Sequence, residues 1–117
     1  MTNTIPERYL KNTGTLQPEE IKLLGKKRVF VAGCGGLGGY ILEMLARLGV
    51  LNISVADGDA FTAGNLNRQI LCTEQNIGMY KTAAAIKRIQ EINSEVKFNA
   101  HQVYVDIAFY VHYGVSA

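Results

Sequence analysis

A glycine-rich stretch between a short apolar run and a helical pattern limits the possible folds of this chain more than any other feature. The apolar run at 28–32 ends at Gly33, and glycines then recur through Gly39. A compact apolar run of this kind predicts a buried strand. Apolar residues at helical spacing follow from 40 to 48, and Gly49 ends the pattern. We therefore predict a strand, a glycine loop and a helix in direct succession.

The same alternation continues downstream. Residues 52–56 predict a second strand that ends at Asp57, residues 58–77 read mainly as loop, and residues 78–93 predict a second helix before a third strand at 96–100. Strands that alternate with helices predict a parallel sheet with right-handed crossovers. The expected fold class is therefore α/β, a Rossmann-like βαβαβ half with a parallel sheet.

The segments outside this unit have a different character. Residues 1–17 are polar and predict an irregular arm, and a short helix with acidic residues in its first turn is expected from Pro18 until Gly25 ends it. The last residues are rich in Val, Tyr, Phe and Ile without a clean period. The expected parts are an arm with a short helix at 1–27, a Rossmann-like domain at 28–102 and a tail at 103–117.

Composition excludes several classes of protein. The 117 residues suffice for one domain, and a hydrophobic content of 48% supports a core. The net charge of +2 is too small to indicate nucleic acid or a membrane surface as partner, and no apolar run approaches the roughly 18 residues of a membrane span. Without an apolar signal core at the N-terminus, we expect a cytoplasmic location. Cys34 and Cys72 are too few for a zinc site or a disulfide framework, so we predict no zinc site and two buried thiols.

The glycine loop is a candidate phosphate site. Glycines let backbone N–H groups approach a phosphate without a Cβ in the way, and the helix N-terminus that follows adds partial positive charge. We therefore predict that a nucleotide phosphate binds at Gly33, Gly35, Gly36 and Gly38. The alternative is a tight turn that binds nothing.

Acidic residues follow the second predicted strand. A carboxylate at the end of this strand, here Asp57, can accept hydrogen bonds from ribose hydroxyls. Asp59 is a further candidate for a nucleotide or metal role. The segment Asp57-Gly58-Asp59 is also typical of turns, which is the alternative interpretation. These features fit NAD and ATP equally.

Two basic residues favour a triphosphate. Arg68 lies past the ribose carboxylate, and its forked guanidinium suits phosphate oxygens. Lys81 adds a second cation near the start of the second predicted helix. Each alone reads equally well as a solvated surface charge. Together, after the glycine loop and Asp57, they indicate a nucleotide triphosphate site.

This series of motifs resembles the ThiF/MoeB/HesA family, adenylyltransferases related to ubiquitin-activating enzymes, and the resemblance runs from Val29 to about Asn93. The matching residues are Gly33-Cys34-Gly35-Gly36-Leu37-Gly38, Asp57-Gly58-Asp59, Asn65-Leu66-Asn67-Arg68-Gln69, Gly78 and Lys81. The glycine loop alone is a weak match, whereas the whole series in this order is specific.

The resemblance implies an ATP and Mg²⁺ site and an acyl-adenylate product. Gly36 would lie against the phosphates and Asp57 would hold the ribose. The residues implied around the triphosphate are Asn65, Arg68, Gln69 and Lys81. Arg68 and Lys81 would act catalytically by stabilising charge as pyrophosphate leaves. The implied substrate is a carboxylate, typically the C-terminal glycine of a ubiquitin-like sulfur carrier, while a peptide or a modified tRNA base also fits the family.

The N-terminal arm also resembles the family. Arg8 would reach the nucleotide of a neighbouring subunit, so we expect a homodimer. Family members often have a second arginine at the position of Lys11. The lysine keeps the positive charge but lacks the forked guanidinium.

The resemblance fades after about residue 102, and the chain is expected to be truncated relative to the full family fold. Family members take a magnesium-binding aspartate from later sequence, often with two CxxC zinc pairs and in some members with a catalytic cysteine. Neither Cys34 nor Cys72 matches that cysteine. We therefore expect the 117-residue chain alone not to turn over. Two rivals stay open: an NAD-dependent oxidoreductase domain, and a non-catalytic remnant that binds nucleotide or only dimerises.

Overall fold

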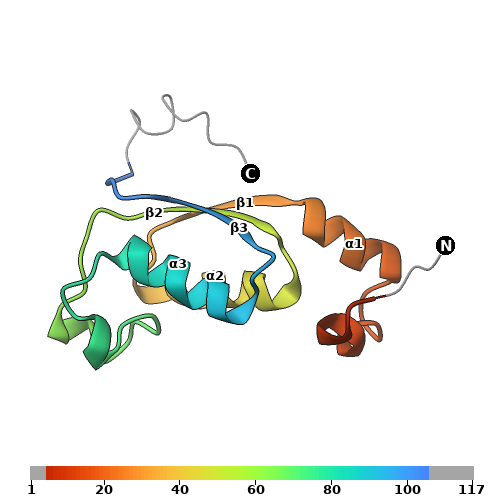
Figure 1. The fold of residues 1–117 in the computed structure, drawn as a ribbon, viewed down its shortest axis with the longest axis horizontal. Coiled ribbons are helices and arrows are strands. Elements are labelled where there is room, and N and C mark those ends of the chain that lie inside the picture. The colour runs from red at the N-terminus through yellow and green to blue at the C-terminus, as the bar shows by residue number, and fades with distance from the viewer. Residues whose placement is uncertain (1–4, 106–117) are drawn as a thin grey trace.

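A three-stranded parallel sheet forms the centre of the computed structural model, which describes residues 5–105 (Figure 1). The strands are β1 (Arg28–Ala32), β2 (Asn52–Ala56) and β3 (Lys97–His101), in the order β1-β2-β3. Both pairings are parallel. The predicted α/β, Rossmann-like βαβαβ fold is confirmed.

Two helices make the crossovers and cover one face of the sheet. In Figure 1, α2 (Gly36–Leu48) and α3 (Lys81–Ile92) lie side by side beneath the strands. Two right-handed crossovers that progress in the same direction place both helices on the same face. The fully buried core between the layers includes Leu42, Ile53, Val55, Phe61 and Ile89.

A buried carboxylate fastens the two helices to each other. Glu43 of α2 accepts hydrogen bonds from Nε and Nη2 of Arg88 of α3, both at 3.2 Å, and Arg47 approaches the same carboxylate at 3.6 Å. The hydrogen bond to Glu43 raises the pKa of Arg88. A forked pair of this kind fixes the helix spacing as well as supplying energy.

The N-terminal arm docks at the amino ends of the strands. It consists of the 3-10 helix η1 (Glu7–Asn12) and of α1 (Pro18–Lys26). Tyr9 is buried, and its hydroxyl accepts a hydrogen bond at 3.0 Å from the amide of Asn93, which is itself fully buried. The ring lies against Gly49, where a Cβ would come within 2.9 Å of it. The arm therefore packs on the C-terminal end of α2.

The observed boundaries differ from the predicted ones in specific places. The strands at 28–32 and 52–56 are confirmed, whereas the third lies at 97–101 rather than 96–100. α2 begins at Gly36, inside the glycine loop and before the predicted start at residue 40. α3 begins at Lys81 rather than 78, because the φ of +90° at Gly78 is not helical.

The expected irregular segments contain short ordered turns. The arm predicted to be irregular includes η1, and the loop at 58–77 contains the 3-10 helices η2 (Ala63–Asn65) and η3 (Glu74–Asn76). In each of the latter two, a threonine and an asparagine form a capping box. Most of the expected tail at 103–117 lies outside the described residues. Within 5–105, no helix is long and apolar enough to cross a membrane.

Candidate functional site

The glycine loop makes a tight turn from β1 into α2. At two positions of this turn only glycine fits. Gly33 has a φ of +90°, a backbone conformation that other residues rarely adopt. A Cβ at Gly38 would collide with the backbone carbonyl of Gly33. These two glycines are therefore required by the turn itself, whether or not a ligand binds.

The N-terminus of α2 has no side-chain cap. Gly35 is the N-cap residue, and no side chain accepts a hydrogen bond from the first turn. The first N–H groups of a helix have no partner within the helix and carry the positive end of its dipole. Backbone donors aimed away from the helix in this way suit a phosphate.

Two buried polar side chains converge on this helix end. Gln69 and Lys81 are each only 7% exposed. A Cβ placed on Gly35 would lie 2.6 Å from Gln69 Oε1 and 3.0 Å from Lys81 Nζ, so both side chains reach the glycine loop. The Lys81 ammonium also lies 5.6 Å from the centre of the Phe61 ring, a favourable cation–π arrangement.

The Gln69 amide is not satisfied within the protein. Its Oε1 is buried and, in the described part of the chain, has no hydrogen-bond partner. A buried polar atom without a partner costs about 1–3 kcal/mol. Rotating the amide by half a turn would place its NH2 group at the same point as a donor. A polar ligand in front of Gly35 would remove this penalty.

Asp57 holds the glycine loop against the end of β2. Its Oδ2 accepts a hydrogen bond from the backbone N–H of Cys34 at 3.0 Å, and its Oδ1 accepts one from the N–H of Asp59 at 2.8 Å. The second bond is the turn interaction that the sequence offered as an alternative to ribose binding. The two roles are compatible, because a carboxylate has about four acceptor positions.

The remaining predicted residues on the loop after β2 are engaged locally. Asn65 Oδ1 accepts from the N–H of Thr62 at 2.9 Å and so caps η2. The Arg68 guanidinium donates to the carbonyl of Gly64 at 3.2 Å and to Asn67 Oδ1 at 2.9 Å. Both side chains are therefore tied to their own loop, unlike Gln69 and Lys81.

Arg8 lies at the opposite end of the molecule from the glycine loop. Its Nη1 donates to the carbonyl of Ile92 at 3.3 Å, at the C-terminal end of α3. Figure 1 shows the N-terminal arm beyond the amino ends of the strands. A role for Arg8 at a nucleotide would therefore require the site of a second chain.

Comparisons with known proteins agree with this geometry. The ThiF family model matches residues 9–107. The chain belongs to the ThiF family. The adenylyltransferase and sulfurtransferase uba4 of Pyricularia oryzae is 42% identical over 74 residues, which are 63% of this chain and 15% of the relative. The sulfur carrier protein adenylyltransferase of Thermus thermophilus is 37% identical over 86 residues, 74% of this chain and 32% of the relative.

Solved structures show the same fold for this ThiF-family chain. The E. coli tRNA N6-threonylcarbamoyladenosine dehydratase TcdA, crystallised in complex with ATP, has a TM-score of 0.88 and 28% identity. The match covers 92% of this chain and 44% of TcdA. The chain therefore spans less than half the length of each of these relatives.

Phe61 and Tyr104 contact predicted site residues, although neither was itself predicted. Phe61 underlies Lys81, and the hydroxyl of Tyr104 donates to Asp59 Oδ1 at 2.7 Å. Phe61 lies in a loop without periodicity, so no sequence signal marks it. Tyr104 lies beyond the stretch in which the ThiF resemblance was strong.

Within residues 5–105, no group of three or more His, Cys, Asp or Glu side chains could hold a metal ion.

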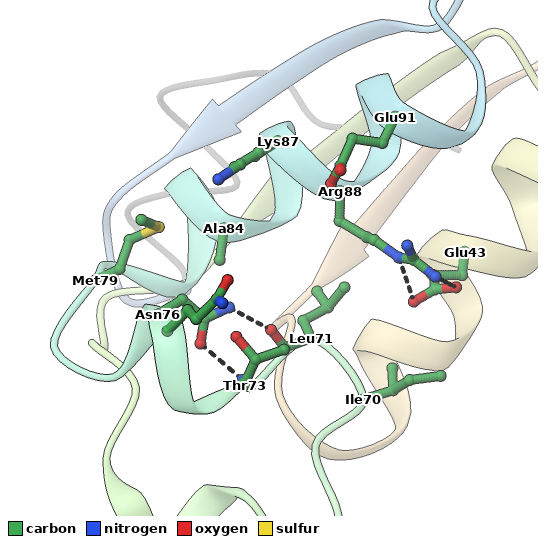
Figure 2. A pocket seen from close by; sticks show the side chains of 11 residues that line it. Glu43, Ile70, Leu71, Thr73, Asn76, Met79, Ala84, Lys87, Arg88 and Glu91 are labelled. Atoms are coloured by element: carbon green, nitrogen blue, oxygen red, sulfur yellow. Dashed lines mark hydrogen bonds and ion pairs between the residues drawn. The ribbon is translucent and has the colours of Figure 1, made fainter.

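A separate pocket of about 390 Å³ opens between α2, α3 and η3 (Figure 2). None of the predicted nucleotide residues lines it. In Figure 2, Arg88 spans one side of it to reach Glu43, while Asn76 binds the carbonyl of Leu71 at 2.6 Å. These side chains are occupied in holding the surrounding elements together.

Cys34 is predicted to be chemically inert. Burial, and then the neighbouring Asp57 carboxylate, raise the pKa of Cys34 to about 12, although Lys81 acts in the opposite direction. Only the thiolate reacts with iodoacetamide, and a thiol with so high a pKa is almost entirely protonated at pH 8. Peptide mapping should find Cys34 unmodified in the folded protein and alkylated in urea. Equal rates in both states would contradict the buried environment.

Proposed function

We propose that this chain is the ATP-binding part of an adenylyltransferase that activates a carboxylate as an acyl-adenylate. The observation that supports this most is the pair of buried polar groups at the uncapped start of α2. Gln69 and Lys81 both reach Gly35, and the Gln69 amide oxygen has no partner in the described part of the chain. A phosphate placed there would meet backbone donors, a cation and an amide at once.

A triphosphate suits this arrangement better than the pyrophosphate of NAD. Lys81 is buried and faces the glycine loop, so it is not the solvated charge that the alternative interpretation required. Arg68 is exposed on the adjoining loop, and within residues 5–105 its guanidinium is held by a carbonyl and an amide oxygen. Phosphate oxygens offer a stronger, charged acceptor for the same guanidinium. The TcdA structure, which contains ATP, supports this choice.

The proposed chemistry is displacement at the α-phosphate. A carboxylate oxygen attacks the α-phosphorus, a new acyl–O–P bond forms, and the bond to the β-phosphate oxygen breaks to release pyrophosphate. Lys81 and Arg68 would stabilise the charge that moves onto the leaving pyrophosphate. When bound, Mg²⁺ would neutralise phosphate charge during this transfer. The chain's own residues would orient the nucleotide, with Asp57 at the ribose and the N-terminus of α2 at the phosphates.

The proposed substrate is the C-terminal carboxylate of a ubiquitin-like sulfur carrier. The Thermus thermophilus relative is named for a sulfur carrier protein, which supports this class. TcdA is named for a tRNA base, so a modified base is the competing substrate class. Both substrates would meet the same phosphate site and would differ only in the surface that positions the acyl group.

We further propose that the chain forms a homodimer through α2. Leu37, Ile41, Met44 and Leu48 form a stripe along the exposed face of this helix, and Leu37 and Met44 are 74% and 68% exposed. A contiguous exposed apolar stripe marks an interaction surface. The intervals between the four stripe residues are the same from either end of the helix. An antiparallel pair of α2 helices would therefore set Leu37 against Leu48 of the partner subunit. A two-fold interface requires such self-complementarity.

The same pairing explains the position of the arm. Tyr9 fixes the arm at Gly49, the C-terminal end of α2. In an antiparallel pair this end would lie beside the N-terminal end of the partner's α2, where the partner's glycine loop begins. Arg8, which is remote from the glycine loop of its own chain, would thereby approach the nucleotide site of the second copy.

Calorimetry of nucleotide binding tests the ligand. ATP with Mg²⁺ should bind more tightly than NAD, and Arg68→Ala and Lys81→Ala should each weaken ATP binding roughly tenfold or more, since a charged hydrogen bond contributes about 1.5–3 kcal/mol. Lys87→Ala is the matched control, because it removes the same charge from an exposed position of α3. NAD binding as tight as ATP, or unchanged ATP affinity in both site variants, would contradict the proposal.

Light scattering tests the dimer. The wild-type chain should be a dimer at tens of micromolar, and Met44→Glu should make it a monomer, because a charge would be buried at the centre of the apolar stripe. Gln90→Glu adds the same charge at an exposed position of α3 and should leave the dimer intact. A wild-type monomer, or a dimer that survives Met44→Glu, would rule out the α2 interface.

A further inference from the structure

An exposed aromatic ring stands beside the candidate ribose residue. Tyr104 follows the end of β3, and its side chain is 69% exposed, yet its hydroxyl is fixed by a 2.7 Å hydrogen bond to Asp59 Oδ1. The ring lies directly over Gly58, where a Cβ would come within 2.7 Å of it. Tyr104 is therefore held at its hydroxyl and along one edge, while most of the ring faces solvent.

The order of the strands places this ring where the third part of a nucleotide would lie. The glycine loop follows β1, Asp57 follows β2, and Tyr104 follows β3, and the sheet order is β1-β2-β3. A nucleotide with its phosphates at the first strand end and its ribose at the second would continue toward the third. The base would then arrive beside Tyr104.

We propose that Tyr104 is a base-binding residue, whose ring stacks on the purine of the nucleotide held by the glycine loop and Asp57. The inference rests on the proposed function, because it assumes that a nucleotide occupies that loop. An exposed aromatic ring of this kind stacks on a base through its π-face, which every base shares. Recognition here would therefore come from stacking area rather than from hydrogen bonds to particular atoms of the base.

Asp59 and Gly58 act as positioning residues in this arrangement. Asp59 orients the ring through the phenolic hydroxyl, and this hydrogen bond raises the pKa of Tyr104. Gly58 lets the ring approach the backbone at the end of β2, because any Cβ there would push the ring away. In this arrangement Asp59 serves the base by holding the ring of Tyr104 in place.

Titration of the 117-residue chain with ATP and with tripolyphosphate, which lacks ribose and base, tests the inference. Tyr104→Ala should weaken ATP binding roughly tenfold, the scale of base stacking, and leave tripolyphosphate binding unchanged. Tyr104→Phe retains the ring and should lose less. The exposed ring makes little contribution to the fold, so thermal melting should be close to wild type in both variants.

A tryptophan substitution gives a second readout. The chain contains no tryptophan, so Tyr104→Trp introduces a single indole at the site. ATP should quench its fluorescence by stacking, whereas tripolyphosphate should not.

The outcomes separate the two proposals. If the wild-type chain binds tripolyphosphate and ATP, but Tyr104→Ala binds ATP as tightly as wild type and the indole is not quenched, the role of Tyr104 is overturned and the phosphate site stands. If the wild type binds neither compound, the nucleotide site and the base-binding role both fail.

Discussion

The hydrogen bond from the Cys34 N–H to Asp57 Oδ2 is the interaction on which the site depends. It joins the loop after β1 to the end of β2, at 3.0 Å, in a part-buried setting. Parallel neighbouring strands deliver both groups to the same edge of the sheet. Once the loop is fixed there, α2 begins beside Asp57, and the N-terminus of α2 faces the space that Gln69 and Lys81 also reach. The burial that shields this bond also makes the Cys34 thiol a packing group rather than a nucleophile.

The fold was predicted well where the apolar pattern and the positions of the glycines indicate the same element boundary. β1 is a compact apolar run that is followed by a glycine, β2 is followed by Asp57, and the limits of both strands were predicted correctly. β3 alternates polar and apolar side chains at the edge of the described sheet, and it begins and ends one residue later than predicted. The start of α2 was missed because glycine is a poor helix former, so propensity hides a helix whose first turn is glycine-rich.

The candidate site was predictable only in part, because its residues come from separate loops. The family resemblance implied Asn65, Arg68, Gln69 and Lys81 as a group. The structure brings Gln69 and Lys81 together at Gly35, while Arg68 is turned onto its own loop. Tyr104 contacts Gly58 and Asp59 because β3, which precedes it, pairs with β2, which precedes them. Such contacts follow from tertiary packing and leave no local pattern. The roles of these residues in binding nucleotide remain predictions.

Calorimetric titration of Gly35→Ala with ATP tests the central claim most directly. Gly35 has a φ of −91°, which alanine adopts freely, and the atoms nearest to the new Cβ would be the flexible ends of Gln69 and Lys81. The protein should therefore fold and melt close to wild type, while the methyl group fills the phosphate position and lowers ATP affinity at least tenfold. Gly14→Ala, which meets no atom within 4 Å, is the control and should bind as wild type does. Unchanged ATP affinity in a folded Gly35→Ala variant would show that the nucleotide phosphates bind elsewhere.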